Sequence, residues 1–480
     1  MKLKGICVSV ALLALGVVTA PSLPNNQQGQ ALDYEAVFKT HLARINIPIG
    51  VVRAVRPNTP GTTVTPTTTS PQAQEFIALN PTNPNNSVAV TSDFSLRGGA
   101  NTTKYVVSFN NGAAGTWFEH FIPTPNGMPA TSDGRTWEFN SDPVVAIDGQ
   151  ANVFLASLYF NDSFRNKANG VYVSVGRLVS SNLGFSAETT VPVVTNLAAN
   201  TDTFEDKEWI AVDNSSNACT TGNAYVSWTH FVGSTNIILL SRSVNHGKTW
   251  SSPVRISDTA LDGAVQGSQV AVGPGGEVYV VYEVFFVGNN RRHYMAKSTN
   301  GGESFSPSVA ITPLFNELSF SSTYRKNSFP SLAVSPANGH VFVVYADQPS
   351  PVSGAEVEFI SSKDGGTTFS SPVTVNNPSL GHQFMPALAV DGSGVIHVSW
   401  FDTRNDVSRT SSYDIFEANS YNEGGNFSVN NRVTPISIDA GNSTFIGDYA
   451  GIAASGGFAH PVWTSGGFNN GLLQTATLHR

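Results

Sequence analysis

The chain has 480 residues, of which 12% are charged and 40% are hydrophobic, and it contains 43 glycines and 27 prolines. Sparse charge together with abundant glycine favours an all-β protein over a helical bundle or a disordered chain. The net charge of -8 comes without a dense cluster of lysine or arginine, which argues against nucleic acid as the main partner.

The first 20 residues have the pattern of a secretory signal peptide. Lys2 and Lys4 precede an apolar run over residues 6–18, and the small residues Thr19 and Ala20 follow it. This run is too short to cross a bilayer, and no other apolar segment is long enough to do so. We therefore expect a secreted, extracellular protein without a membrane span.

Two further segments precede the main domain. Residues 21–55 are mixed in composition, and within them residues 45–55 are a candidate for a strand that closes the fold. Residues 56–72 are rich in Pro and Thr, which predicts an extended linker. A repeated β domain is then expected over residues 73–480.

One pattern recurs seven times in this domain: an apolar strand that ends in Ala-Val-Asp or a related triplet, a Gly/Asn turn, and a strand of alternating Val, Tyr and Trp. The copies begin at Glu75, Asp142, Lys207, Ser268, Phe329, Met385 and Asp448. Alternation with a period of two, bounded by turn residues, is typical of β-hairpins. Seven copies predict a seven-bladed β-propeller of four-stranded antiparallel sheets around a central channel. Six blades are the alternative if the first or last unit is irregular.

A second pattern recurs four times at a spacing of roughly 50 to 60 residues, and it reads Ser, then Asn or Asp, then Gly, then an aromatic residue. The copies are Ser243–Trp250, Ser298–Phe305, Ser362–Phe369 and Ser420–Phe427, with shorter echoes from Ser132 and Ser181. The Asn or Asp side chain can hydrogen-bond the backbone two residues on, and Gly supplies a positive φ. The aromatic residue then returns into the sheet as a buried anchor.

These copies resemble the Asp-box (BNR) repeats of sialidase-like β-propellers. In that family the box is a structural turn between the third and fourth strands of a blade. The resemblance therefore implies structural roles for Asn245, Asn300, Asp364 and Asn422. It also implies that ligands bind on the opposite face of the disc, over the mouth of the channel. The loops there join the second strand to the third, and each blade to the next.

Two charged clusters fall in those loops, Glu-Asp-Lys-Glu-Trp at 205–209 and Phe-Asp-Thr-Arg-Asn-Asp at 401–406. Close carboxyl groups can have their pKa values driven apart, as an acid paired with a base or nucleophile requires. Arginine can bind a carboxylate through two hydrogen bonds. The predicted catalytic residues are Asp206, Glu208 and Asp402. The predicted substrate-binding residues are Trp209, Arg325, Arg404, Asp448 and Tyr449.

Each prediction has a structural alternative. Asp402 and Arg404 form the kind of pair that pins a loop as a salt bridge, and residues 205–208 are also consistent with a solvated, self-neutralising turn. Trp209 and Tyr449 are either platforms on which a sugar stacks or ordinary core residues.

Sialidases of this superfamily bind the substrate carboxylate with three arginines, the first in an Arg-Ile-Pro motif. The nearest match here, residues 44–48, carries two inserted residues, and the arginine triad cannot be assigned. The resemblance thus implies a glycan-directed glycoside hydrolase that works at the channel mouth with Asp/Glu acid–base chemistry. The alternative is a non-catalytic propeller that binds glycan or protein at the cell surface. A lyase or another hydrolase on the same scaffold also stays open.

We expect no cofactor and no metal, because the histidines lack the spacing of metal ligands. Ca²⁺ stays possible because oxygen-rich loops are plentiful, although no EF-hand spacing supports it. The expected partner is a glycan or glycoconjugate, and the expected state is a monomer.

Overall fold

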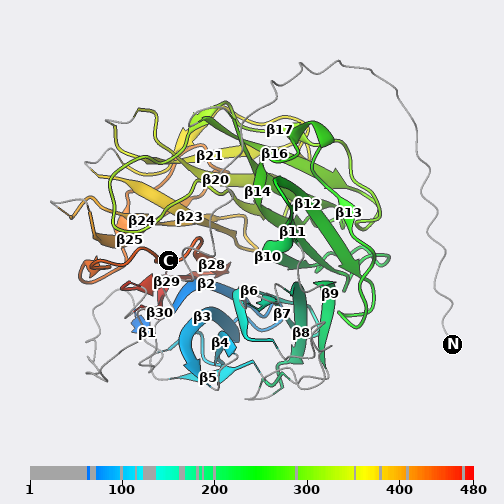
Figure 1. The fold of residues 1–480 in the computed structure, drawn as a ribbon. Helices are drawn as coiled ribbons and strands as arrows, with labels where there is room; N and C mark the ends of the chain where they lie inside the picture. Colours follow the sequence, from blue (N-terminus) through cyan, green and yellow to red (C-terminus); the bar gives the residue numbers. More distant parts are fainter. Residues whose placement is uncertain are drawn as a thin grey trace.

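The computed structural model describes the strand at 62–64 and residues 72–479. Within the second range it leaves out 98–100, 114–115, 123–136, 162–167, 180–182, 186–188, 198–201, 287–289, 351–352, 378–380, 407–409 and 468–470. The described residues form seven antiparallel sheets arranged as a ring (Figure 1). The prediction of a seven-bladed β-propeller is confirmed, and the six-bladed alternative is wrong.

The blades follow one another along the chain. Blade 1 consists of β2 (Gln72–Leu79), β3 (Ser87–Arg97), β4 (Asn101–Ser108) and β5 (Trp117–Phe121). Blade 2 consists of β6 (Phe139–Ile147), β7 (Asn152–Phe160), β8 (Asn169–Arg177) and β9 (Thr190–Asn196). Blade 3 consists of β10 (Thr203–Val212), β11 (Ala224–Val232), β12 (Thr235–Ser243) and β13 (Val254–Arg255). A short 3-10 helix, η2 (Thr259–Leu261), precedes blade 4.

The remaining blades repeat this order. Blade 4 consists of β14 (Val265–Val272), β15 (Val278–Phe285), β16 (Asn290–Ser298) and β17 (Val309–Ala310), with β18 (Phe315–Asn316) also on β16. Blade 5 consists of β19 (Ser331–Val334), β20 (Val341–Asp347), β21 (Glu356–Ser362) and β22 (Val373–Thr374). Blade 6 consists of β23 (Gln383–Val390), β24 (Ile396–Asp402), β25 (Ser412–Ser420) and β26 (Asn431–Arg432), with β27 (Ile438–Asp439) also on β25. Blade 7 consists of β28 (Gly451–Ser455), β29 (Phe458–Ser465), β30 (Leu472–His479) and β1 (Thr62–Val64).

The first strand of the chain closes the ring. β1 pairs with β30 in antiparallel register, with Thr63 opposite Ala476. The predicted closing segment, residues 45–55, lies outside the described residues. The strand that pairs with β30 comes instead from the range predicted as a linker, because Thr-rich sequence is as compatible with an edge strand as with an extended chain.

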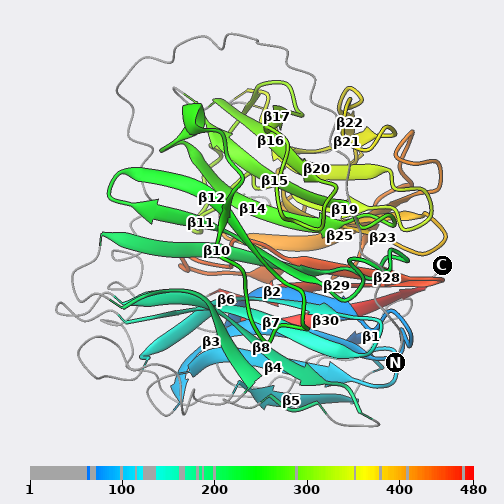
Figure 2. The same ribbon diagram turned by 90° about the vertical axis from the view of Figure 1, so that its right-hand side faces the viewer.

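The innermost strands surround the axis. Each of them contacts the next, and β28 contacts β2, so that the circle is complete. In Figure 2 the strands β2, β6, β10 and β28 run beside one another through the middle of the molecule. Every innermost strand carries a partly exposed alanine at the same place. These residues are Ala78, Ala146, Ala211, Ala271, Ala333, Ala389 and Ala453. Each of these alanines packs against an apolar cluster of the core.

Five innermost strands also share a β-bulge. The register with the second strand shifts just before the alanine in β2, β6, β10, β14 and β23. The residue inside each shift has a positive φ. These residues are Gln74, Asp142, Lys207, Gly267 and Met385. A bulge breaks the regular alternation of a strand and redirects one side chain, and in this way it positions the site described below.

The second sequence pattern forms four closely similar turns, which we call signature turns. In the first, Ser243 Oγ accepts a hydrogen bond from the Gly247 N–H at 2.9 Å, and Asn245 Oδ1 accepts one from the Thr249 N–H at 3.0 Å. The same bonds recur at Ser298, Ser362 and Ser420. The prediction of a bond two residues on is wrong, because the Asn or Asp side chain reaches the N–H four residues ahead.

The signature turns also join neighbouring blades. Their glycines have positive φ values of 77, 79, 87 and 83° and lie against an apolar or aromatic side chain of the preceding blade. The contacted residues are Phe154, Tyr225, Met295 and Phe359. A fifth turn of this kind begins at Ser108 in blade 1, where Gly112 N–H donates to Ser108 Oγ at 3.0 Å. The sequence pattern missed it because Trp117 follows the glycine by five residues instead of three. The echoes from Ser132 and Ser181 begin outside the described residues.

The cores lie between adjacent blades. One cluster joins Val90 and Tyr105 of blade 1 to Val145 and Leu155 of blade 2, and similar clusters fill the other interfaces. Within the described residues, no helix has the length and apolarity needed to span a membrane.

Candidate functional site

Side chains from around the ring meet near the axis, at the level of the bulges. They come from β6, β10, the loop between β18 and β19, and the segment that leads into β28. We call the following six residues the axial cluster: Asp142, Lys207, Glu208, Arg325, Asp448 and Tyr449. Because these segments belong to separate blades, only closure of the ring brings the six together.

Lys207 is the hub of the axial cluster. Its Nζ lies 2.5 Å from Asp448 Oδ2, 3.8 Å from Asp142 Oδ1 and 5.3 Å from the centre of the Tyr449 ring. Only 4% of the lysine side chain is exposed. Burial lowers the pKa of Lys207, but the carboxylates of Asp142 and Asp448 outweigh burial, and the net pKa is raised. The ammonium group therefore stays charged.

Asp448 is held as a carboxylate by two cations. Arg325 Nε donates to its Oδ1 at 2.7 Å, and Arg325 Nη2 donates to its Oδ2. Burial raises the pKa of Asp448, whereas Arg325 and Lys207 lower it, and the net shift is downward. The Asn327 side chain donates to the Asp448 backbone carbonyl at 2.8 Å. Lys207, Arg325 and Asn327 thus fix Asp448 in place as a carboxylate.

Glu208 has the opposite environment. The residue is 1% exposed, and neither of its carboxyl oxygens has a hydrogen-bond partner among the described residues. Burial, with the charge of Asp142 as the next cause, raises its pKa well above the usual range. This environment favours the protonated form of Glu208, which is a carboxyl group that can donate a proton.

Asp142 is the second carboxyl group beside Glu208. Burial raises its pKa, Lys207 and Arg325 favour its ionised form, Asp448 opposes ionisation, and the net pKa of Asp142 is raised. Its backbone N–H donates to Ser92 Oγ of blade 1 at 3.3 Å. An ionised Asp142 makes the loss of a proton from Glu208 harder.

Three partly exposed aromatic side chains form a row that begins at Tyr449, beside Lys207. The ring centres of Trp209 and Tyr449 are 5.6 Å apart, and those of Trp209 and Phe76 are 4.8 Å apart, with edge-to-face geometry in both pairs. The Tyr449 hydroxyl donates to the Pro143 carbonyl at 3.2 Å. The two predicted sugar platforms thus pack on each other and still keep exposed surface.

The structure separates the remaining predicted residues from this cluster. Asp206 is fully buried and accepts a hydrogen bond from Gln266 Nε2 of blade 4 at 3.0 Å. Asp206 therefore bonds to the neighbouring blade, while Lys207 and Glu208 belong to the axial cluster. The bulge accounts for this difference between adjacent residues, since it interrupts the alternation of β10.

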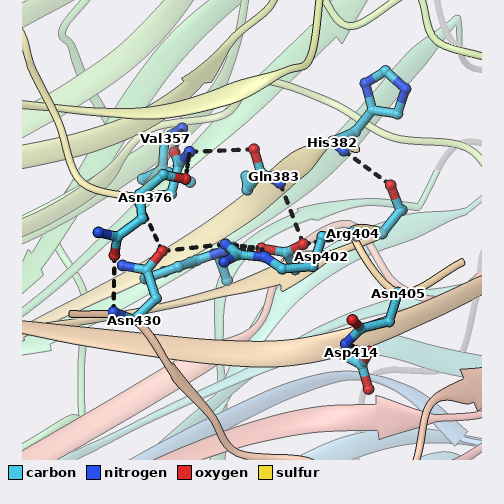
Figure 3. Close-up of polar contacts among 12 residues, drawn as sticks. Val357, Asn376, His382, Gln383, Asp402, Arg404, Asn405, Asp414 and Asn430 are labelled. Carbon is cyan, nitrogen blue, oxygen red and sulfur yellow. Dashed lines mark hydrogen bonds and ion pairs between the residues drawn. The ribbon is translucent and has the colours of Figure 1, made fainter. Parts of the chain in front are cut away.

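Asp402 and Arg404 form a separate network in blade 6 (Figure 3). Asp402 Oδ2 accepts from Trp400 Nε1 at 2.9 Å and from Arg404 Nη2 at 2.6 Å, and its Oδ1 accepts from Gln383 Nε2 at 3.2 Å. The guanidinium carbon of Arg404 lies 4.1 Å from the centre of the Phe416 ring. Hydrogen-bond donors thus surround the Asp402 carboxylate, and the pair with Arg404 has the geometry of a salt bridge that holds a loop in place.

Asp142 was missed as a site residue from sequence, and Lys207 was noted only as a member of the cluster at 205–209, although a signal for both exists. When the seven inner strands are aligned on their shared alanine, both residues stand four positions before it, where the bulge lies. Among the described residues, no group of three or more His, Cys, Asp or Glu is placed to hold a metal ion.

No protein-family model matches the chain, and no curated protein is detectably similar to it in sequence. Solved structures share its fold. A polysaccharide lyase, an ulvan lyase, matches with a TM-score of 0.52 at 11% identity over 87% of this chain and 96% of that one. The Trypanosoma rangeli sialidase matches with a TM-score of 0.47 at 10% identity, over 88% of this chain and 59% of that one. The Hadza microbial sialidase Hz136 matches with a TM-score of 0.46 at 14% identity, over 82% and 76%. At 11% identity, the match to the ulvan lyase shows a likeness of fold alone.

Proposed function

We propose that this propeller is a secreted, glycan-directed glycoside hydrolase whose reaction takes place at the axial cluster. The observation that carries the proposal is Glu208, a buried carboxyl group without a hydrogen-bond partner among the described residues, next to the second carboxyl group of Asp142. The ulvan lyase with the same architecture supports carbohydrate as the substrate class. The apolar run at 6–18 supports secretion.

Glycoside hydrolysis needs one carboxyl group as an acid and one carboxylate as a base or nucleophile. Glu208 supplies the proton that the leaving-group oxygen takes as the glycosidic bond breaks. Asp142 is the proposed partner, because Lys207 and Arg325 favour its ionised form against the burial that raises its pKa, and its charge adds to the burial that favours the protonated form of Glu208. Water supplies the hydroxyl group that ends on the sugar and, through Asp142, the proton that restores the pair.

The sugar would bind at the exposed edge of the axial cluster. Tyr449 and Trp209 offer aromatic surface, and the Arg325 side chain is 18% exposed. Sugars stack on aromatic faces through their apolar C–H groups, and arginine donates to their hydroxyl oxygens.

A second candidate is a non-catalytic propeller that binds glycan or protein. The observation that favours it is the locking of Asp402 and Asp448 in salt bridges, together with the low exposure of Glu208 and Asp142, at 1% and 4%. Such a protein would use the partly exposed aromatic rim and would need no proton transfer.

A screen of the protein on a panel of aryl glycosides that includes a sialoside separates the two candidates. We expect turnover by the wild type and a loss of at least about 100-fold in Glu208→Gln, which keeps the shape of the neutral carboxyl group. The control is Glu303→Gln, at a residue on the signature turn of blade 4 whose side chain is 60% exposed. Absence of turnover across the panel, combined with binding on a glycan array, would establish the second candidate instead.

A further inference from the structure

Blade 3 carries a glutamate–histidine pair outside the axial cluster. Glu205 on β10 and His230 on β11 lie opposite each other in the register. His230 Nδ1 is 2.9 Å from both carboxyl oxygens of Glu205. The glutamate side chain is fully buried, whereas 21% of the histidine side chain is exposed. The pair thus reaches from the interior of the blade to solvent.

The Glu205 carboxylate also accepts hydrogen bonds from two side-chain donors. Trp228 Nε1 donates to Oε2 at 2.6 Å, and Asn196 Nδ2 donates to Oε1 at 2.7 Å. The backbone N–H of Glu205 donates to Asn169 Oδ1 at 3.0 Å. A carboxylate surrounded in this way has acceptor sites and no proton to give, so His230 Nδ1 must be the donor in their contact. In the neutral ring this contact selects the tautomer that has its lone pair on Nε2.

The Nε2 atom lies at the exposed side of the ring. Among the described residues nothing hydrogen-bonds to it, and it is not one of the buried atoms that lack a partner. An anionic ligand at Nε2 would be repelled by the carboxylate of Glu205, which contacts the other nitrogen of the ring. The chemistry that fits is a neutral group that donates a hydrogen bond, such as a hydroxyl.

Blade 6 shows that the fold does not need a histidine here. Asp402 on β24 and His230 on β11 occupy equivalent positions, each two residues after a tryptophan. In blade 3 the tryptophan Nε1 donates to Glu205, and in blade 6 it donates to Asp402 itself. In blade 6 the cation that pairs with Asp402 is Arg404, whose guanidinium group cannot accept a hydrogen bond. The buried acid of blade 6 is thus neutralised by a side chain that offers no hydrogen-bond acceptor.

We propose that His230 Nε2 is the acceptor of a hydroxyl-binding subsite in blade 3, with Glu205 as the positioning residue that holds its tautomer. The ligand class is a carbohydrate, and this part of the inference rests on the proposed function. The subsite lies on the same blade as Lys207 and Glu208, three residues along β10 from Glu205 to Glu208. It would hold a hydroxyl group of a ligand that also occupies the axial cluster.

The test uses His230→Asn in a Glu208→Gln background. Asparagine keeps a donor near the position of Nδ1 for Glu205 and removes the Nε2 acceptor. The Glu208→Gln protein removes the proposed proton donor, so binding to a glycan array is measured apart from turnover. We expect the double variant to melt within about 3 °C of its parent and to bind the recognised glycans at least about 10-fold more weakly, which corresponds to one lost hydrogen bond.

Equal binding by the double variant and its parent would overturn the subsite and leave the proposed function standing. Absence of any glycan binding by the Glu208→Gln protein would overturn both. A readout independent of ligand is acylation of neutral imidazole by diethyl pyrocarbonate, mapped by mass spectrometry. We expect His230 to be modified at Nε2 and the fully buried His293 to be spared. Failure of His230 to react would contradict an available lone pair.

Discussion

Lys207 and Asp448 form an ion pair of 2.5 Å between blade 3 and the segment entering blade 7, which are not neighbours in the ring. The two residues are 241 positions apart in the chain. Their contact crosses the axis, where Arg325 adds a second cation to Asp448 from the loop between blades 4 and 5. The centre of this propeller is therefore held by charge, whereas its blade interfaces are held by apolar packing.

Removal of the lysine should strongly destabilise the fold. Lys207→Met leaves the buried charges of Asp142 and Asp448 with less compensation, which we expect to lower the free energy of unfolding by about 3–5 kcal/mol. Urea denaturation measures the change. The matched control is Lys363→Met, whose side chain is 62% exposed and pairs with Glu423, and we expect it to change stability by less than about 1 kcal/mol. A small effect of Lys207→Met would show that the axial pair does not hold the blades together.

Glu75 should make stability fall as pH rises. Burial raises its pKa to about 8, while a hydrogen bond from Thr464 Oγ1 opposes that rise. The folded state therefore binds a proton that the unfolded state has lost, so stability is greatest below the ordinary carboxyl pKa. It decreases as pH rises towards 8, by up to about 1.4 kcal/mol per pH unit from this group. Thermal unfolding between pH 5 and 8 measures the slope, and Glu75→Gln should flatten it. An unchanged slope in the variant would assign the pH dependence to other groups.

The signature turns should tolerate no side chain at their glycine. A Cβ on Gly424 would overlap the ring of Phe359 in blade 5, and the residue has a φ of 83°. Gly424→Ala should lower the free energy of unfolding by at least about 2 kcal/mol, from overpacking and from backbone strain. Gly392→Ala is the control, because a Cβ there meets nothing within 4 Å. Similar stabilities of the two variants would contradict a role of the turn in joining blades 5 and 6.

Loss of the closing strand should open the ring. A chain that begins at residue 67 lacks β1 and leaves the edge of β30 unpaired, and we expect its melting temperature to drop by about 5 °C or more. A chain that begins at residue 57 keeps β1 and serves as the control. If this longer chain melted at the lower temperature as well, residues 21–56 would contribute to closure too.

The sequence alone is enough for the architecture, because the architecture is built from local contacts. Ser243, Asn245 and Gly247 lie within five residues of each other, and their hydrogen bonds form within a single turn. The shared alanine of each inner strand repeats with every blade. Four signature turns and seven copies of the strand pattern could therefore be read directly from the chain and counted.

The candidate site was predictable only in part. Sequence neighbours suggested that Lys207 is neutralised by Glu205, Asp206 and Glu208, yet Glu205 binds His230 and Asp206 binds Gln266. The bulge in β10 redirects these adjacent side chains, and its left-handed residue is a lysine that no turn pattern marks. The counter-ions of Lys207 are instead Asp142 and Asp448, on other blades.

Local hydrogen bonds and strand periodicity thus determine from the sequence that the chain folds as a seven-bladed propeller, because each blade repeats the same short-range pattern. Which acids stay ionised and which keep a proton was decided only by the tertiary structure. Asp448 meets two cations across the axis, and Glu208 meets none at hydrogen-bonding distance. The physical reason is that the pKa of a buried group depends on the charges and donors around it, and here ring closure supplies those charges from distant parts of the chain.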